Sequence, residues 1–418
     1  MIPRRFFLVL AAFLLMVLLY VDRACIAVAK DPIALELKLS NKQMGWVFSA
    51  FSLGYALMQT PGGMLADVFG SRKALAAIVA FWSLFTGLTA TVWNFASLLA
   101  VRFLFGVGEA GALPGVARAV YAWIPKEERG LVQGISFSGM RLGAAFTLPA
   151  LAWMVEKFGW KMAFMLLMGV GFCWSIIWYA WFRDDPTQHP GISRSELEHI
   201  LAHRQQSTSE ASADKLNART LFGSGTMWVA MTQYFCSNFT FFFCLTWLPP
   251  YLKDKHVLTV ADAAFYAMWP LVGGAIGNIA AGWLVDAIFR RNRWVLSRRI
   301  PAIIGFCLAA AGLVGSLQAG SLVAEVACLS IAIFGADMTL PPSWALCVDI
   351  GGRHSGAVSG TMNMAGNLGS FLTALAFPYL LAWTGGPTTF FYVGSALNVI
   401  AAGLWLLARP DLKFKGEE

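Results

Sequence analysis

Apolar stretches of about 20 residues recur along the whole chain, and each is long enough to cross the roughly 30 Å hydrocarbon core of a bilayer as a helix. We count about twelve of them: 6–29, 44–66, 74–94, 97–122, 131–153, 161–183, 224–250, 263–285, 300–319, 322–345, 355–382 and 389–408. Hydrocarbon offers no hydrogen bonds to exposed backbone groups, so a helix satisfies its own. The pattern predicts an all-α membrane protein with about twelve transmembrane helices.

Composition agrees with this class, and the charge distribution sets an orientation. Of 418 residues, 58% are hydrophobic and 13% are charged, whereas soluble domains usually carry about 25% charged residues. A net charge of +8 is also typical of proteins that bind nucleic acid, but here the basic residues are concentrated in alternate segments between the spans. With a cytoplasmic N-terminus, twenty basic residues fall in inside segments and seven in outside segments. This bias places both termini in the cytoplasm and argues against a nucleic-acid partner.

One long polar segment interrupts the apolar pattern, from about residue 184 to 220. Within it, Ser193 and Glu196 have the spacing of a capping box, which predicts a short amphipathic helix at the cytoplasmic surface. We therefore expect three parts: an N-terminal six-helix bundle over 1–183, a cytoplasmic linker over 184–220 and a C-terminal six-helix bundle over 221–418.

The two halves contain related motifs in the same order, which predicts two pseudo-symmetric bundles. The second and eighth spans lead into similar loops, here termed the gating loops: Gly63, Asp67, Gly70, Arg72 and Lys73, and again Gly282, Asp286, Arg290 and Arg291. The fourth and tenth spans each contain a glycine five residues before a Leu-Pro pair: Gly108 with Leu113-Pro114, and Gly335 with Leu340-Pro341. Internal repeats mark secondary transporters. Such a gating loop could latch the two halves in one conformation, and the alternative is an ordinary positive-inside loop.

Four charged residues interrupt two of the spans. Asp22 and Arg23 end the first apolar run, and Arg102 and Glu109 lie inside the fourth. Each would cost roughly 2.5–3.5 kcal/mol at the centre of a spanning helix, so the charges must face a partner or a water-filled path. Two acids and two bases on two spans indicate a proton or anion route.

The expected depths of these residues suggest how they pair. Arg102 and Glu109 are seven residues apart, so they share one helix face about 10 Å apart along its axis. Asp22 and Arg102 should both lie in the outer half of the membrane and could pair. Glu109 should lie deeper, and it reaches Arg23 only if the helices tilt favourably.

This arrangement suggests a coupling chemistry. Burial raises the pKa of a carboxyl group and a nearby arginine lowers it, so a carboxyl can switch when the arginine changes partner. We expect Glu109 to be the main proton carrier. Protonated Glu109 would release Arg23, whose planar fork suits a substrate carboxylate. Asp22 would be a second proton site tuned by Arg102. The alternative is two structural ion pairs that hold the protein together.

The chain resembles the major facilitator superfamily through the signature loop of Gly63, Asp67, Gly70, Arg72 and Lys73. The second-half copy is degenerate, because it lacks the glycine after Asp286. More closely, the chain resembles the anion:cation symporter family. That family includes bacterial sugar-acid transporters such as the D-galactonate transporter, the vesicular glutamate transporters and sialin. The matching stretches are Tyr20 to Arg23, Arg102 to Pro114, Trp123 to Arg129, Leu245 to Pro249 and Gly360 to Asn367.

The resemblance implies the major facilitator fold and the same four roles for the charged residues. It also implies that Tyr55 is a substrate-binding tyrosine. Met140-Arg141 departs from the family, whose sugar-acid transporters often have a neutral polar pair there. Arg141 indicates either a more acidic substrate, such as a dicarboxylate, or a partner for an internal acid such as Asp337. Further candidates for substrate binding, for which packing or an interface belt is an alternative, are Tyr20, Thr246, Trp247, Ser343, Trp344, Asn363 and Asn367.

Motifs of soluble enzymes are missing from the sequence. There is no Walker loop, no HExxH and no Cys/His cluster, so we expect no enzyme activity, no cofactor and no metal. Our interpretation is a monomer in a bacterial inner membrane that imports an organic anion with protons by alternating access. A sugar acid, such as an aldonate or hexuronate, or a small carboxylate or dicarboxylate would be the cargo. The alternatives are an anion exchanger, a sodium-coupled carboxylate transporter and a transporter-like sensor that does not transport.

Overall fold

The computed structural model describes residues 3–203 and 218–411, and the regular secondary structure of these residues is helical. Sixteen α-helices are described, and all twelve predicted apolar stretches coincide with helical segments. Among the described residues, eight helical stretches are long and apolar enough to cross a membrane by length and hydropathy. The predicted all-α membrane class is confirmed. Residues 204–217 of the expected linker lie outside the described residues.

The helices divide between two compact units. Unit 1 comprises residues 1–124, 142–204 and 353–361, and unit 2 comprises 125–141, 205–352 and 362–418. The first helices in chain order are α1 (Arg4–Val28), α2 (Lys30–Glu36), α3 (Asn41–Leu88), α4 (Phe95–Glu109), α5 (Ala112–Trp123), α6 (Arg129–Trp181) and α7 (Arg194–His203). The later ones are α8 (Ala218–Gly223), α9 (Gly225–Thr246), α10 (Leu248–His256), α11 (Val260–Phe289), α12 (Trp294–Gln318), α13 (Leu322–Met338), α14 (Leu340–Gly351), α15 (Ser355–Thr384) and α16 (Thr388–Trp405).

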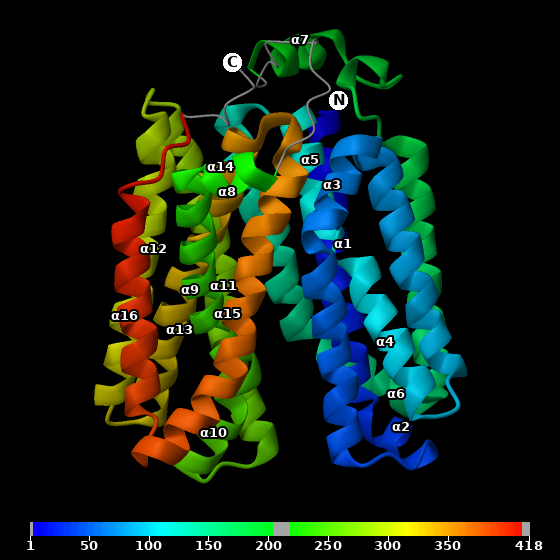
Figure 1. Ribbon diagram of the computed structural model, residues 1–418, viewed down its shortest axis with the longest axis vertical. Helices are drawn as coiled ribbons and strands as arrows, with labels where there is room; N and C mark the ends of the chain where they lie inside the picture. The colour runs from blue at the N-terminus through cyan, green and yellow to red at the C-terminus, as the bar shows by residue number, and fades with distance from the viewer. Residues whose placement is uncertain (1–2, 204–217, 412–418) are drawn as a thin grey trace. The chain divides into compact units, whose positions relative to one another are not determined.

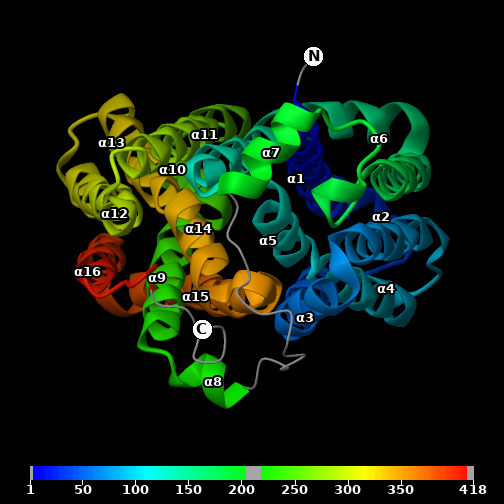
Figure 2. The same ribbon diagram turned by 90° about the horizontal axis from the view of Figure 1, so that it is seen from above.

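Within each unit, long helices pack along their length. In unit 1, α3 packs against α4 and α5. In unit 2, α12 packs between α13 and α16, as both ribbon views show (Figures 1 and 2). The division into two six-helix bundles around the 184–220 linker stays a prediction.

Two of the long helices each contain two predicted spans joined at a glycine. Helix α3 kinks at Gly70 (φ 78°) and α6 at Gly159 (φ 79°). These dihedrals lie in the region that side chains with a Cβ avoid. A Cβ on Gly70 would also lie 2.5 Å from the carboxylate of Asp184. The glycine is therefore required on both counts, and it turns the chain from one span into the next.

Helix breaks occur at the same place in the two motif copies. The fourth predicted span is divided into α4 and α5, and the tenth into α13 and α14. Each new helix begins at or within two residues of its Leu-Pro pair, since proline lacks an N–H and fits the first helical turn. The repeat detected in the sequence is therefore also a repeat of backbone geometry.

Helix α7 is the short helix predicted after Ser193. The Ser193 hydroxyl accepts a hydrogen bond from the Glu196 N–H, at 3.2 Å. The Glu196 carboxylate does not complete the predicted capping box. It accepts instead from the backbone N–H groups of Arg4 and Arg5, both at 2.9 Å, and so caps the N-terminus of α1. Figure 1 shows α7 at the same end of unit 1 as the start of α1.

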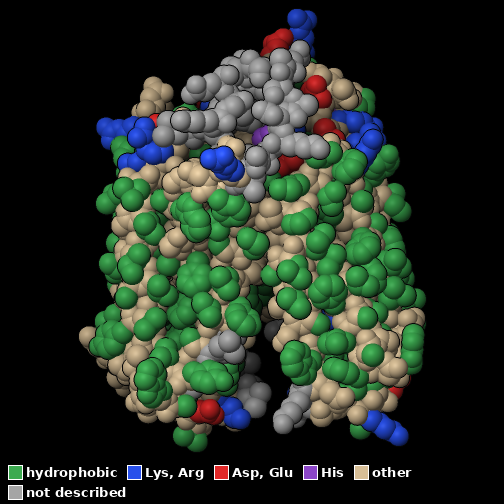
Figure 3. Space-filling view, viewed as in Figure 1, with side chains coloured by type: hydrophobic (Ala, Val, Ile, Leu, Met, Phe, Trp, Pro, Cys, Tyr) green, Lys and Arg blue, Asp and Glu red, His purple; other side chains and the backbone are tan. Residues whose placement is uncertain are grey.

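The helix surfaces are apolar where a soluble protein would be polar. Leu10 of α1, Ile176 of α6 and Trp283 of α11 are all more than half exposed. On the face shown in Figure 3, hydrophobic side chains cover the middle of each unit and charged side chains gather at the ends. Apolar surface this extensive is unfavourable in water, so lipid must cover it.

One buried carboxylate in unit 2 ties α10 to α13. Glu325 of α13 is fully buried, and it accepts hydrogen bonds from Tyr251 Oη (2.5 Å), Lys255 Nζ (2.7 Å) and His256 Nε2 (2.7 Å). These three donors come from the short helix α10. Burial and the neighbouring Glu325 carboxylate raise the pKa of Tyr251, so its hydroxyl remains a donor at physiological pH.

We predict that Glu325→Leu lowers the free energy of unfolding by about 1–3 kcal/mol, because it leaves the buried Tyr251 hydroxyl without its acceptor and the partly exposed Lys255 without its partner. Thermal unfolding in detergent measures the loss. Glu198→Gln is the control, because Glu198 forms an exposed i,i+4 pair with Arg194 whose loss costs well under about 1 kcal/mol. Equal melting temperatures for the two variants would contradict the prediction.

Candidate functional site

The centre of unit 1 contains a buried ion pair between Arg23 of α1 and Glu109 of α4. Arg23 Nε donates to Glu109 Oε1 at 2.6 Å. The Glu109 side chain is 1% exposed, whereas that of Arg23 is 20% exposed. The pairing that the sequence made conditional on helix tilt is therefore present. The guanidinium is the member of the pair that an incoming ligand can reach.

The break in the fourth span determines where Glu109 lies. Glu109 is the last residue of α4, and α5 begins at Ala112. The last turns of a helix leave carbonyl groups unsatisfied and carry partial negative charge. A carboxylate at this end is disfavoured unless a cation accompanies it, and Arg23 supplies that cation.

Three aromatic rings surround the Arg23 guanidinium. Its Cζ lies 4.5 Å from the Tyr55 ring centroid, 5.2 Å from Phe51 and 5.4 Å from Tyr20. Cation–π contacts of this kind stabilise a guanidinium without neutralising it. Tyr20 and Tyr55 were predicted at this site, but Phe51 was missed. Its only signal in the sequence is its position four residues before Tyr55 on one helix face.

Asp22 and Arg102 do not form the ion pair that the sequence suggested. Asp22 is 1% exposed, and its Oδ2 accepts a hydrogen bond from the indole Nε1 of Trp82 at 3.0 Å. Arg102 is 2% exposed and stacks on Phe105, with its Cζ 4.4 Å from the ring centroid. Within residues 3–203 and 218–411, Arg102 has no salt bridge within 4.0 Å. Trp82 was missed because a tryptophan in a span ordinarily indicates packing or an interface.

Unit 2 contains a second buried pair at the corresponding helix break. Arg141 of α6 donates from Nε and Nη2 to the two carboxylate oxygens of Asp337, both at 2.6 Å. The guanidinium also covers the Phe241 ring, at 3.4 Å from its centroid. Asp337 is the last residue but one of α13, just before the break. Of the two interpretations left open for Arg141, this is the pairing with an internal acid.

Four of the predicted substrate residues of unit 2 occupy two settings. Ser343 bonds to Gln233 Oε1 and Trp344 to Tyr234 Oη, so both are in a buried network. Asn367 Nδ2 donates to the Asn363 carbonyl within α15.

The other candidates in unit 2 show no shared polar site. Thr246 is exposed and bonds to the Phe242 carbonyl, and Trp247 packs on Phe377. Met140 is buried.

The aspartates of both gating loops cap the N-terminus of a helix. Asp67 accepts from the backbone N–H groups of Gly356 (3.0 Å) and Ala357 (2.8 Å), in the first turn of α15 within unit 1. Asp286 accepts from Gly130 (2.9 Å) and Leu131 (2.8 Å), in the first turn of α6 within unit 2. A carboxylate at a helix N-terminus satisfies free N–H groups and the helix dipole together.

The gating-loop glycines permit this approach. A Cβ on Gly63 would lie 2.2 Å from the Gly356 carbonyl oxygen, and one on Gly282 would lie 2.5 Å from that of Gly130. Any larger residue at either position would therefore push the capping aspartate away from its helix.

The basic residues of the gating loops lie at the helix ends. Arg72 Nε donates to the Tyr179 carbonyl at 2.8 Å, and its backbone N–H donates to Asp184. Lys73 and Arg290 are exposed. In the degenerate second copy, the positive φ falls on Asn292 (58°), whereas in the first copy it falls on Gly70 (78°).

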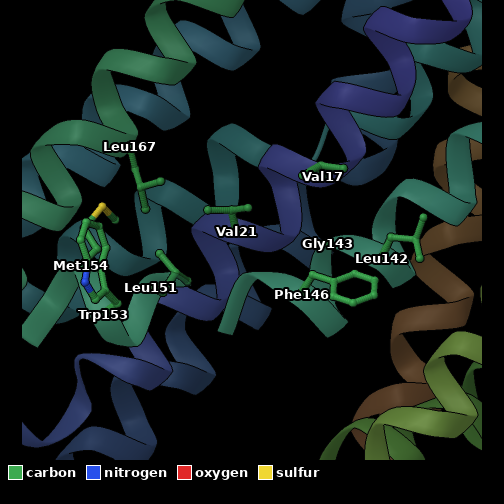
Figure 4. A pocket seen from close by; sticks show the side chains of 9 residues that line it. All are labelled: Val17, Val21, Leu142, Gly143, Phe146, Leu151, Trp153, Met154 and Leu167. Carbon is green, nitrogen blue, oxygen red and sulfur yellow. The ribbon is translucent and has the colours of Figure 1, made fainter. Parts of the chain in front are cut away.

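A cavity of about 560 Å³ in unit 1 is separate from these polar groups. Figure 4 shows its lining, with Val17 and Val21 from α1 and the other side chains from α6. None of the predicted site residues lines it. Within the described part of the chain, no group of three or more His, Cys, Asp and Glu side chains could hold a metal ion.

Comparison with known proteins identifies the family. Residues 12–374 match the Major Facilitator Superfamily. The probable sulfoacetate transporter SauU of Cupriavidus necator is 33% identical over 400 residues, which cover 94% of this chain and 91% of that protein. The probable galactarate/D-glucarate transporter GarP of Escherichia coli is 32% identical over 396 residues, which cover 90% and 88%. The proton:xylose symporter XylE matches in structure with a TM-score of 0.77 at 16% identity, covering 97% and 96%.

We predict opposite effects on stability for the two charged residues of α4. Glu109→Leu should lower the free energy of unfolding by about 1.5–3 kcal/mol, because it leaves the partly buried Arg23 guanidinium without its charged partner. Arg102→Met should be neutral or stabilising, because the native guanidinium is buried without a salt bridge. Chemical unfolding of both variants in detergent checks this. A destabilisation by Arg102→Met as large as that by Glu109→Leu would show that Arg102 has a stabilising partner.

Proposed function

This chain belongs to the major facilitator superfamily and is a multi-pass membrane transporter, and we propose that it imports an organic anion together with protons. The observation that carries the proposal is the Arg23–Glu109 pair, in which a reachable cation is neutralised by a buried acid. In such a pair, the Glu109 carboxylate can be neutralised by a proton, and the Arg23 guanidinium can then bind a substrate carboxylate in its place. Both events are then coupled through one guanidinium.

The proposed cycle begins with the ionised pair. When Glu109 takes up a proton, it no longer neutralises Arg23. Arg23 then binds the carboxylate of the substrate through its planar fork. Tyr20 and Tyr55, whose rings already contact the guanidinium, would orient the bound anion. After the substrate leaves, Arg23 returns to Glu109 and favours release of the proton on the other side.

The cargo that we propose is a sugar acid or small carboxylate, with diacids favoured. The similar proteins SauU and GarP are named for sulfoacetate and for galactarate and D-glucarate, and each of these compounds has two acidic groups. Arg141 is already paired with Asp337, so we assign the first acidic group of the cargo to Arg23.

Two acidic residues would allow more than one proton per cycle. At a membrane potential of about 100 mV, each net positive charge moved inward contributes about 2.3 kcal/mol. With two protons, a monoanion moves with one net positive charge and a diacid moves without net charge, whereas with one proton the diacid would move against the membrane potential. Glu109 and Asp22 are both buried in unit 1 and supply two sites. We propose Glu109 as the main carrier and Asp22 as the second.

We propose that the two aspartate caps are the contacts that break and re-form during alternating access. Asp67 and Asp286 each hold a helix N-terminus through two backbone hydrogen bonds. These bonds are individually modest, and a hydrated carboxylate can replace them with water. The excess of basic residues in alternate loops supports cytoplasmic termini and an inner-membrane location in a bacterium.

We predict that Glu109→Gln abolishes accumulation of substrate against a gradient but retains binding and exchange, because Arg23 stays available and no proton can be released. Proteoliposomes with a pH gradient and labelled D-glucarate, galactarate or sulfoacetate measure both activities. The matched control is Glu36→Gln, since Glu36 forms an exposed pair with Lys161 outside the spans. A Glu109→Gln protein that still concentrates substrate would refute the assignment of the proton carrier.

We predict that diacids and sugar acids raise the melting temperature of the protein at low pH, and that Arg23→Lys loses this effect because lysine lacks the bidentate fork. The panel consists of sulfoacetate, galactarate, D-glucarate, an aldonate and a hexuronate.

Replacing sodium by potassium under a fixed pH gradient should leave uptake unchanged. Uptake that requires sodium would favour sodium coupling, and stabilisation without any uptake or exchange would favour a sensor.

A further inference from the structure

The carboxyl group of Asp22 has an unusual partner for a buried acid. Its Oδ2 accepts a hydrogen bond from the Trp82 indole at 3.0 Å, and its Oδ1 has no hydrogen-bond partner. Asp22 is 1% exposed and Trp82 is fully buried. A buried carboxylate is normally stabilised by a charged donor. Here the donor is neutral.

A charged donor is available in the same unit but is not used. The Nε and Nη1 atoms of Arg102 are buried and have no hydrogen-bond partner. The charge of Arg102 acts on Asp22, so the two groups are electrostatic neighbours. A hydrogen bond from Arg102 to the ionised carboxylate would add the attraction between two opposite charges, which the neutral indole does not supply. Asp22 would therefore turn to Arg102 if nothing held it.

The Trp82 indole is placed to hold the Asp22 carboxyl group in its present position. Trp82 lies on α3, Asp22 on α1 and Arg102 on α4, so the carboxyl group has donors on two different helices. Trp82 has no exposed surface, which leaves its ring little freedom to move. The Nε1–H is the only polar group of that ring.

The ionisable groups around Asp22 come from two helices. Arg23 and Cys25 neighbour it on α1, and α4 contributes Arg102 and Glu109. Helix α3 contributes the neutral indole of Trp82. Helix α6 approaches α1 at Gly143, which brings no charge. Arg102 is thus the cation that competes for Asp22, since Arg23 is engaged by Glu109.

We propose that Trp82 is a positioning residue that holds the Asp22 carboxyl group away from Arg102, so that Asp22 binds a proton in a step separate from Glu109. This inference rests on the proposed proton-coupled function. Without the indole, Asp22 would pair with Arg102, remain ionised over a wider pH range and no longer serve as a second proton site. Trp82 does not touch the substrate in this proposal and acts only through Asp22.

A first experiment follows the indole N–H resonance of Trp82 by NMR and needs no substrate. The protein has 17 tryptophans, and labelling their indole nitrogens with 15N gives one N–H resonance for each. The resonance that disappears in Trp82→Phe belongs to Trp82. We expect it to shift with pH in the native protein and to stop shifting in Asp22→Asn. A Trp82 resonance that is constant from pH 4 to 9, or that still titrates in Asp22→Asn, would overturn the inference.

A second experiment measures the consequence for coupling. In Trp82→Phe we expect the pH at which D-glucarate uptake is half-maximal to move about one unit towards acid, because pairing with Arg102 opposes protonation of Asp22. Trp82→Phe should add no further shift in the Asp22→Asn background. The control is Trp178→Phe, which removes an indole that donates to the Ser71 carbonyl instead of a carboxylate. Trp178→Phe should keep the native pH profile.

The outcomes separate this inference from the function on which it rests. If D-glucarate is not transported, the proposed cargo fails, and the indole titration alone decides the role of Trp82. If uptake is normal and the pH profile of Trp82→Phe superimposes on that of the native protein, Trp82 has no positioning role. A shift in Trp82→Phe of the same size in the Asp22→Asn background would also refute it, because Trp82 would then act independently of Asp22.

Discussion

A guanidinium held between a buried carboxylate and three aromatic rings is the interaction on which the rest of this structure depends. Arg23 is charged at every accessible pH, so its partly buried site has to stabilise a permanent cation. Glu109 provides the negative charge now, and the rings stabilise the cation without removing its charge. In the mechanism that we propose, the guanidinium alternates between this internal acid and the carboxylate of a ligand.

The same construction occurs in both halves of the sequence. Each Leu-Pro pair starts a new helix, and an acid lies at the end of the helix before it, Glu109 in α4 and Asp337 in α13. Each acid pairs with an arginine from another helix. The pairs differ in burial and in the number of carboxylate oxygens that bind the arginine. Asp337 holds Arg141 through two oxygens in a fully buried setting, whereas Glu109 holds Arg23 through one. The first unit therefore has the looser pair.

The gating loops show why a short motif can be recognised in sequence while its role depends on structure. The glycine spacing around Asp67 and Asp286 was visible in the chain, and the glycines do permit a close helix approach. The partner was not visible. Each aspartate caps a helix that is distant in sequence, α15 for Asp67 and α6 for Asp286. Backbone N–H groups carry no residue identity, so no sequence pattern could have pointed to them.

The sequence by itself determined the all-helical membrane class, the repeat, and the residues Asp22, Arg23, Arg102 and Glu109, because apolar length and the cost of burying charge are properties of single segments. The choice of partners was decided only by the tertiary structure. Arg23 pairs with Glu109, while Asp22 turns to Trp82 and leaves Arg102 without a carboxylate. Depth along a helix is readable from residue number, but the rotation and tilt of one helix against another arise from side-chain packing among many residues far apart in the chain.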